Sequence, residues 1–458
     1  MIRDLLVQDQ MLARLGAVEA GALEALDALN RNAEAATELA KTYGVDPRQL
    51  RDAADILAET SVQLKAAKPE PGAYMPRDRY GSIFQSAIEE FYRQQDCVSQ
   101  AVALGLDEGE ADPLSDEVLT SDPLLEPPEA LGLEPFSTLD PRWVGAFLAA
   151  KFLSEAHGTY PFPDDRAPVL PLGEKARLIL VGDWATGIRR AQDVAQWMGQ
   201  HAQDGVKQGR DTHVISLGDV YYAGFEHEYR DRFLAYWPVL TGDANKIHSW
   251  ALNANHDMYT GGFGYFDLML ADPRFAAQQK SSYFLLENEN WQIAGLDSAY
   301  APPDPKGDRG NLYGGQAQWL HTQRERAPAK RTMLLTHHQL FSSWETNAPL
   351  MEKALEGVFQ QRKIDAWFWG HEHRCAVYRD PRPGQPVPFA SLIGHGGVPV
   401  KVGAQGDAQR APLTYYYQDV HISGYQYLGF VVVDLDGPNW TAVYYNERNI
   451  EHHRESSA

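Results

Sequence analysis

The stretch His213-Val-Ile-Ser-Leu-Gly-Asp-Val-Tyr-Tyr222 predicts a buried strand that ends in an acidic side chain. Parallel strands of an open α/β sheet carry such residues to the carboxyl edge of the sheet, where these folds bind their ligands. Four further strand-like runs end in residues that can bind metals, and they cover 178–183, 250–257, 332–338 and 366–373. Together, the five endings predict one metal site at one edge of a sheet.

The composition is typical of a globular protein that is large enough for two or three domains. Of its 458 residues, 44% are hydrophobic and 11% aromatic, which argues against disorder. No apolar run reaches the roughly 18 residues that a membrane-spanning helix needs. The first residues lack the apolar segment of a signal peptide, so a cytoplasmic location is expected. The two cysteines, Cys97 and Cys375, do not predict a disulfide framework and fit a reducing compartment.

The net charge of the chain argues against some classes of binding partner. The 41 basic and 62 acidic side chains give a net charge of −21. Long nucleic-acid backbones favour clustered Lys and Arg, so a nucleic-acid partner is not expected. A small anionic substrate remains compatible with this charge, because bound metal ions supply local positive charge.

Two regions follow from the residue patterns. Residues 1–171 predict an all-α region with helical leucine spacing, followed by an acidic connector that contains prolines and no Lys or Arg over 94–141. A solvated connector is the favoured interpretation of this stretch, and an acidic interaction surface is the alternative. The segment 160–171 is expected to be a linker with prolines. Residues 172–458 predict a second domain in which strands alternate with helices.

In this second domain, helices are expected near 188–203, 226–237, 316–326 and 350–361. The late runs 389–393, 428–435 and 440–445 have the β-branched and aromatic content of strands. They suggest a second sheet packed on the first. The predicted fold class is therefore α/β, a layered β-sandwich flanked by helices.

Single motifs in this pattern are weak evidence for a metal. Asp183 alone is more typical of a helix cap or a turn, and the same holds for Asp219. A phenol stands three residues beyond Asp219, and phenolate oxygen suits trivalent iron. We interpret Tyr222 as this ligand and Tyr221 as a core aromatic, with the reverse assignment as the alternative.

The later motifs strengthen the metal hypothesis. Asn255, His256 and Asp257 follow one predicted strand, and His337 follows another. His371 and His373 are two residues apart, so in extended backbone their side chains point the same way. A lone histidine is more often a core residue with its hydrogen bonds satisfied. The joint occurrence of all these residues predicts a metal site.

These motifs resemble those of a known superfamily. Gly182-Asp183, Gly218-Asp219, Asn255-His256-Asp257, His337 and Gly370-His371-Glu372-His373 look like the ordered motifs of the calcineurin-like metallophosphoesterases. Within that superfamily, Gly182-Asp183-Trp184 and the stretch that ends at Tyr222 resemble the purple acid phosphatase branch. The resemblance covers about residues 175–446 and leaves the N-terminal helical region aside.

The resemblance implies a site with two metal ions. Its ligand sets are Asp183, Asp219, Tyr222 and His373 for the first ion, and Asp219, Asn255, His337 and His371 for the second. Asp219 would bridge both ions, with iron at the Tyr222 position and iron, zinc or manganese at the other. His256 would lie near the substrate as an acid or a phosphate ligand. Ala185 and Ala254 depart from the family pattern, because each stands where glycine is usual.

The implied function is hydrolysis of a small anionic phosphoester by a hydroxide that bridges the two metals, with phosphomonoesters preferred. His256 and Asp219 would act in catalysis. A phosphodiesterase of cyclic-nucleotide or nuclease type is one alternative. Another is a catalytically degenerate metal-binding module that regulates or interacts, in which the N-terminal helices bind a protein partner.

Overall fold

The computed structural model describes residues 82, 86, 158–163, 167–302, 309–345, 347–361, 364–379, 387–400, 413–420 and 425–457. The described residues from Gly158 onward belong to one compact unit. The helices expected before residue 158 and the acidic connector lie outside the described residues, apart from Ser82 and Ser86, which are helical and buried. The predicted division between residues 171 and 172 stays a prediction.

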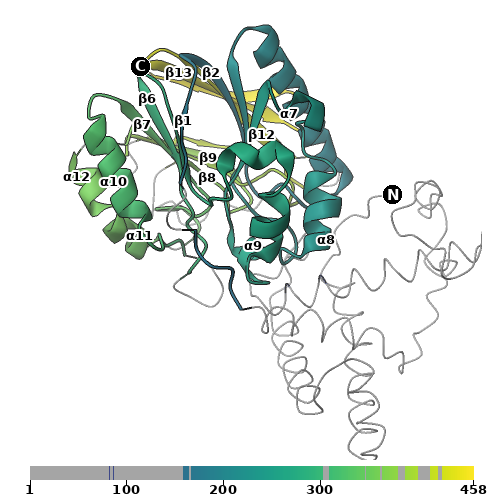
Figure 1. Cartoon of the computed structure of the whole chain (residues 1–458). Helices are drawn as coiled ribbons and strands as arrows, with labels where there is room; N and C mark the ends of the chain where they lie inside the picture. Colours follow the sequence, from purple (N-terminus) through teal and green to yellow (C-terminus); the bar gives the residue numbers. More distant parts are fainter. Residues whose placement is uncertain are drawn as a thin grey trace, which may run out of the picture. The chain divides into compact units, whose positions relative to one another are not determined.

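Two β-sheets form the centre of this unit (Figure 1). One sheet has the order β1 (Val169–Pro171), β5 (Phe284–Glu287), β6 (Trp291–Gly295), β7 (Arg331–Thr336), β8 (Ala366–Trp369), β10 (Phe389–Ile393), β9 (Cys375–Arg379) and β11 (Tyr415–Tyr416). The other has the order β14 (Glu451–Ser456), β13 (Asn439–Asn446), β12 (Gly429–Asp436), β2 (Lys175–Val181), β3 (Asp211–Ser216) and β4 (Ile247–Ala251). Strand β1 lies within the segment that was expected to be a linker.

The strands with the motif residues divide between the two sheets. Strands β2, β3 and β4 run parallel in the second sheet, whereas β7 and β8 run parallel in the first. The prediction of one site at the edge of a single sheet was therefore wrong. The late strands also divide, because β10 pairs with β8 while β12 pairs with β2. Apolar runs indicate burial but not which strands will pair, so the sequence patterns did not predict this arrangement.

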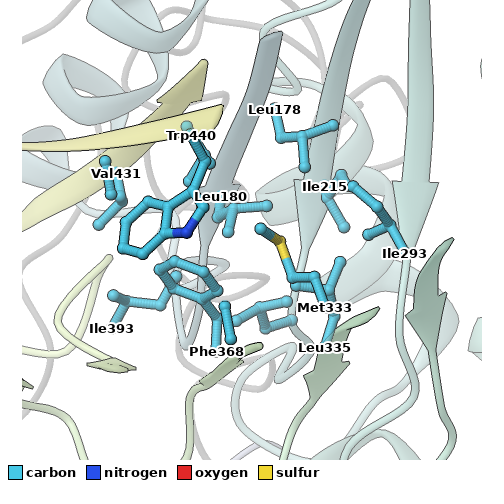
Figure 2. Packing of buried hydrophobic residues seen from close by; sticks show 14 of the residues in the cluster. Leu178, Leu180, Ile215, Ile293, Met333, Leu335, Phe368, Ile393, Val431 and Trp440 are labelled. Atoms are coloured by element: carbon cyan, nitrogen blue, oxygen red, sulfur yellow. The ribbon is translucent and has the colours of Figure 1, made fainter. Parts of the chain in front are cut away.

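The main hydrophobic core fills the space between the two sheets. Side chains alternate across each strand, so that Met333 and Leu335 of β7 enter this core while Leu334 between them faces the other way. Figure 2 shows core residues from both sheets side by side, among them Leu178, Leu180, Ile215, Ile293, Phe368, Ile393, Val431 and Trp440. This packing holds the carboxyl ends of strands from both sheets in fixed positions.

Helices cover the outer faces of the sandwich. Helix α7 (Arg189–Lys207) packs on β2, β3, β4 and β12, and it buries Ala191, Val194, Ala195, Met198 and Ala202 at helical spacing. On the other side, α10 (Gln316–Arg326), α11 (Pro349–Ala354) and α12 (Glu356–Gln361) supply Leu320, Met351 and Val358 to a second core against the first sheet. Figure 1 shows these three helices on one flank and α7, α8 and α9 on the other. The predicted α/β sandwich flanked by helices is confirmed.

The helix boundaries match the sequence unevenly. The helix expected over 316–326 has the same bounds in the structure, and that expected over 350–361 is split into α11 and α12. The region 226–237 holds only the short α8 (Glu226–Glu228) and a π-helix, η4 (Tyr229–Leu234). The remaining short helices are η5 (Thr241–Asp243), α9 (Asn255–Met258), η6 (Gly264–Met269) and η7 (Pro273–Gln278). Among the described residues, no helix has the length and hydropathy needed to cross a membrane.

Candidate metal centre

The residues proposed as metal ligands follow the ends of five strands, and the fold brings them together. Asp183 follows β2, Asp219 follows β3 and Asn255 begins α9 after β4. His337 follows β7, and His371 and His373 follow β8. All six side chains are buried.

The backbone at four of these positions is unusual. Asp183, Asp219, His371 and His373 have φ angles of 56°, 70°, 71° and 50°. The described part of the chain has seven non-glycine residues with positive φ, so these four are the majority. Such conformations cost free energy in L-residues and tend to persist at functional sites. They also correct one expectation, because His371 and His373 lie in a bend rather than in extended backbone.

One half of the site surrounds the hydroxyl group of Tyr221. This oxygen lies 3.1 Å from Oδ1 of Asp183, 2.9 Å from Oδ2 of Asp219 and 2.9 Å from Nε2 of His373. Nε2 of His373 is in turn 3.5 Å from Oδ1 of Asp183. The hydroxyl hydrogen can serve only one of the two carboxylate oxygens, and Nε2 of His373 donates to the hydroxyl only in the tautomer that carries its hydrogen there. A cation would satisfy all four ligand atoms.

The choice between the two adjacent tyrosines differs from the one made on the sequence. Tyr222 was taken as the ligand, yet its ring lies under the guanidinium of Arg232, 5.0 Å from the ring centroid. The backbone N–H of Tyr222 donates to Glu228, and its carbonyl accepts a hydrogen bond from His256. The phenol that contacts Asp183, Asp219 and His373 is that of Tyr221.

The other half of the site gathers acceptor atoms around His337. Nδ1 of His337 is 2.9 Å from the carbonyl oxygen of Leu217, and since a carbonyl only accepts, Nδ1 carries the hydrogen. Nε2 of the neutral ring therefore presents a lone pair. This lone pair lies 2.9 Å from Oδ1 of Asn255, 3.2 Å from Nδ1 of His371 and 3.5 Å from Oδ1 of Asp219.

At most one hydrogen, on Nδ1 of a neutral His371, lies among these four atoms. Burial lowers the pKa of His337, so protonation of this ring does not relieve the crowding at neutral pH. Two nitrogen and two oxygen ligands that converge in this way fit a metal ion of the zinc, iron or manganese type. The donor set therefore fits the second of the two metals implied by the motifs.

Asp219 is the residue that contacts both halves. Its Oδ2 faces Tyr221, while its Oδ1 faces His337 and accepts a 3.3 Å hydrogen bond from the backbone N–H of His256. Burial alone would raise the pKa of Asp219, but His337, His256 and the Asp183 carboxyl together hold it below its usual range. Burial and the charge of Asp219 raise the pKa of Asp183 well above its usual value. Two carboxyl groups this close compete for one negative charge unless a cation lies between them.

Several residues that were not assigned as ligands hold these ligands in place. Asp257 accepts hydrogen bonds from the backbone of Val220 at 3.0 Å and from the Tyr229 hydroxyl at 2.6 Å. Nδ2 of Asn255 donates to the Tyr259 hydroxyl at 3.0 Å, which turns Oδ1 of Asn255 toward His337. Such orienting contacts are a regular part of metal sites. The signal for them in the sequence was the place of Asp257 in the Asn255-His256-Asp257 motif.

The two departures from the family pattern are accommodated. Ala254 has φ −137° and ψ 170°, an extended conformation that any residue adopts, so glycine is not needed there. Ala185 forms an isolated parallel bridge with Val220 and is not among the residues with positive φ, so its position does not need glycine either. Glycine is required instead at Gly218, where φ is 101° and an added Cβ would lie 2.6 Å from Cβ of Ala254.

The ligands differ slightly in their exposure. His371 and His373 are each 7% exposed, whereas Asp183, Tyr221 and His337 are 0% exposed. His256 is 3% exposed, and its ring centroid lies 4.7 Å from that of Tyr221. A ligand that enters from solvent would therefore meet the two histidines that follow β8 first.

Comparison with known proteins finds one family model that matches part of the chain. Residues 176–375 match the family model described as calcineurin-like phosphoesterase, which supports the superfamily that the motifs predicted. No curated protein sequence matches the chain significantly. The matching segment includes every proposed metal ligand.

Solved structures with a similar chain path come from different organisms. One is GAP50, the anchor in the inner membrane complex of Plasmodium, with 12% identity and a TM-score of 0.44 over 61% of this chain and 88% of that one. Another is a predicted phosphoesterase from Streptococcus pneumoniae TIGR4, with 11% identity and a TM-score of 0.28 over 62% and 98%. A Vps29 single mutant from Entamoeba histolytica has 11% identity and a TM-score of 0.26 over 62% and 99%.

Proposed function

We propose that this protein hydrolyses phosphate esters with two bound metal ions, and that small anionic phosphomonoesters are its preferred substrates. The family match supports phosphoester chemistry. The observation that carries the proposal is the meeting of lone pairs at Nε2 of His337 and Oδ1 of Asn255, 2.9 Å apart in a buried site. Two buried acceptors are kept this close when a cation joins them.

The residues divide into two sets with one shared member. Asp183, Tyr221 and His373 would hold the first ion, and Asn255, His337 and His371 the second. Asp219 would contribute one carboxylate oxygen to each ion, as its contacts with Tyr221 and His337 suggest. When bound, two such ions polarise the phosphoryl oxygens and make a water molecule a stronger nucleophile.

The chain itself supplies orientation and exclusion of water. The backbone N–H of His371 donates to Oδ2 of Asp183 at 2.7 Å, which helps to fix the orientation of this carboxylate. The Leu217 carbonyl fixes the ring of His337. Because His371 and His373 are the most exposed of the ligands, we expect an ester to approach the ligand set from their side, with its phosphoryl group toward the ligands.

The direct test combines metal analysis with turnover. Purified full-length protein is expected to retain two metal ions per chain after dialysis and to hydrolyse a generic aryl phosphate faster than bis-aryl phosphodiesters or cyclic nucleotides. A faster rate on a diester would replace the monoester preference while leaving the two-metal site intact. Two bound metals without hydrolysis across the whole panel would contradict the proposed activity and favour a metal-binding interaction module.

The resemblance to purple acid phosphatases leads to a prediction about colour. We expect aerobic loading with iron to give a visible phenolate-to-iron charge-transfer band. Burial and the two nearby carboxylates raise the pKa of Tyr221 well above its usual value, so its hydroxyl keeps its hydrogen until a ferric ion displaces it. Tyr221→Phe should remove the band, and Tyr222→Phe is the matched control that should keep it. Absorption spectra of the three iron-loaded proteins provide the measurement.

Each departure from this pattern has a distinct meaning. If Tyr222→Phe removed the band and Tyr221→Phe kept it, the ligand assignment made from the sequence would hold. A colourless wild-type protein that is fully active with manganese or zinc would exclude the ferric ion but leave the two-metal phosphoesterase proposal standing.

A further inference from the structure

A second group of potential ligands lies outside the proposed metal centre. Cys375, His395 and His452 each offer one ligand atom, and these three atoms lie within 4.8 Å of one another. Cys375 begins β9, His395 follows β10 by two residues and His452 lies in β14. Because β9 and β10 belong to one sheet and β14 to the other, the group sits where the two sheets meet.

The imidazole of His395 is buried without hydrogen bonds. The residue is 1% exposed, and neither of its ring nitrogens has a hydrogen-bond partner. The Ile393 carbonyl lies near the ring but outside hydrogen-bonding geometry. Burying an imidazole in this way forfeits its hydrogen bonds with water and costs free energy, unless another group satisfies the ring.

The orientation of His452 also leaves a lone pair toward the group. The Tyr415 hydroxyl lies 3.3 Å from the carbonyl oxygen of His452, to which it donates, and 2.8 Å from Nδ1 of the same residue. In the tautomer in which the hydroxyl hydrogen goes to the carbonyl, the hydroxyl oxygen accepts a hydrogen from Nδ1. Nε2 of His452 is then the unprotonated nitrogen, and it is shielded from solvent without a hydrogen-bond partner. The ring is held by stacking on Tyr417, with centroids 3.7 Å apart.

We propose that Cys375, His395 and His452 form a separate site for a thiophilic cation of the Zn²⁺ class. One thiolate and two neutral imidazoles favour zinc, whereas cations such as Mg²⁺ or Ca²⁺ favour carboxylate ligands. Ligand atoms bound to one tetrahedral zinc ion at about 2.0 to 2.3 Å lie about 3.3 to 3.6 Å apart. The three atoms lie within 4.8 Å of one another, so they would move together by up to about 1.5 Å on binding. The three ligands leave a fourth position for water or another small donor.

From its location, we expect this cation to stabilise the positions of residues in the proposed metal centre. Cys375 is two residues from His373, and His395 follows Gly394, where an added Cβ would lie 2.9 Å from Oδ2 of Asp183. A cation bound to Cys375, His395 and His452 would thus tie β14 to two segments that contact the first ion's ligands. Because it would bind the folded chain and not the unfolded one, its removal should lower the thermal midpoint of unfolding.

Cobalt(II) gives a spectroscopic signal for a thiolate ligand, and the proposed two-metal centre cannot produce this signal. The ligands proposed for the two-metal centre contain no sulfur, and the chain has only two cysteines, Cys97 and Cys375. Full-length, metal-free, reduced protein would be titrated with Co²⁺ under anaerobic conditions. We expect a thiolate-to-cobalt charge-transfer band in the near ultraviolet, and one more tightly held Co²⁺ per chain in wild type than in Cys375→Ser. Cys97→Ser is the matched control and should keep both the band and that ion.

A histidine variant tests whether the cysteine acts with its neighbours. His452→Gln should keep the thiol but weaken Co²⁺ affinity, read from the same band, by about tenfold or more, as loss of a ligand would require. It also provides the test if Cys375→Ser fails to fold, as judged by circular dichroism. Absence of the band from wild type at saturating Co²⁺, its persistence in Cys375→Ser, or unchanged affinity in His452→Gln would overturn the proposal. None of these readouts requires phosphoesterase activity, so the proposed function is tested separately.

Discussion

Replacing Asp219 by Asn is expected to abolish hydrolysis and to release at least one of the two metals. This carboxylate faces ligand atoms in both halves of the site, with one oxygen 2.9 Å from the Tyr221 hydroxyl and the other 3.5 Å from Nε2 of His337. An amide presents one neutral oxygen in place of two that share a negative charge. Loss of one preorganised electrostatic contact in an active site costs about 10² to 10³ in kcat, and loss of a bridging ligand should cost at least that. Metal analysis and turnover of an aryl phosphate provide the measurements.

Asp211→Asn makes the same chemical change at the opposite end of β3 and serves as the matched control. Asp211 accepts a hydrogen bond from the backbone N–H of Gly173 at 2.7 Å and lies 3.1 Å from Nε2 of His213. It should keep two metals per chain and near-normal turnover. If Asp219→Asn behaved in the same way as Asp211→Asn, Asp219 would not be a shared ligand.

The sequence predicted much of the candidate site because strand endings carry local signals. Asp183 and Asp219 each follow an apolar run and a glycine, and these features can be recognised without knowing which strands pair. Six of the proposed ligands come together after strand ends, although these strands belong to two sheets and not to one. The identities of the neighbouring strands could not be predicted in this way, because both β3 and β7 are buried on two faces and have the same apolar character.

The choice between Tyr221 and Tyr222 shows where spacing in the sequence no longer predicts the direction of a side chain. Side-chain direction alternates regularly only while the backbone stays extended. Gly218 and Asp219 have φ angles of 101° and 70°, so the alternation of β3 is interrupted just before the two tyrosines. The position of a phenol beyond this turn depends on contacts such as that between Tyr222 and Arg232, which comes from a later helix.

The group of Cys375, His395 and His452 was even less accessible to sequence reasoning. No two of these residues are close enough in the chain to form a motif. They meet because β14 joins the second sheet beside β13, while β9 and β10 pair with each other in the first. Only the packing of the two sheets brings the three side chains together.

The last prediction concerns His256, which lies beside the ligand set without belonging to it. Its Nδ1 lies 2.6 Å from the carbonyl oxygen of Tyr222 and must carry a hydrogen, because a carbonyl only accepts. Nε2 is then the atom that can take up and release a proton. Its ring lies next to that of Tyr221, with centroids 4.7 Å apart. We therefore expect His256 to protonate the departing oxygen of the ester.

His256→Ala should retain both metals and reduce kcat by about 10² to 10⁴, the usual contribution of general acid catalysis. The loss should be largest for alkyl phosphates, whose leaving groups need a proton, and smallest for nitrophenyl phosphate, whose leaving group departs as a stable anion. His256→Gln is the matched variant, because its amide can still donate to the Tyr222 carbonyl but cannot transfer a proton. It should lose turnover in the same pattern as His256→Ala. An equal loss for every leaving group, together with loss of metal from either variant, would assign His256 to metal binding instead.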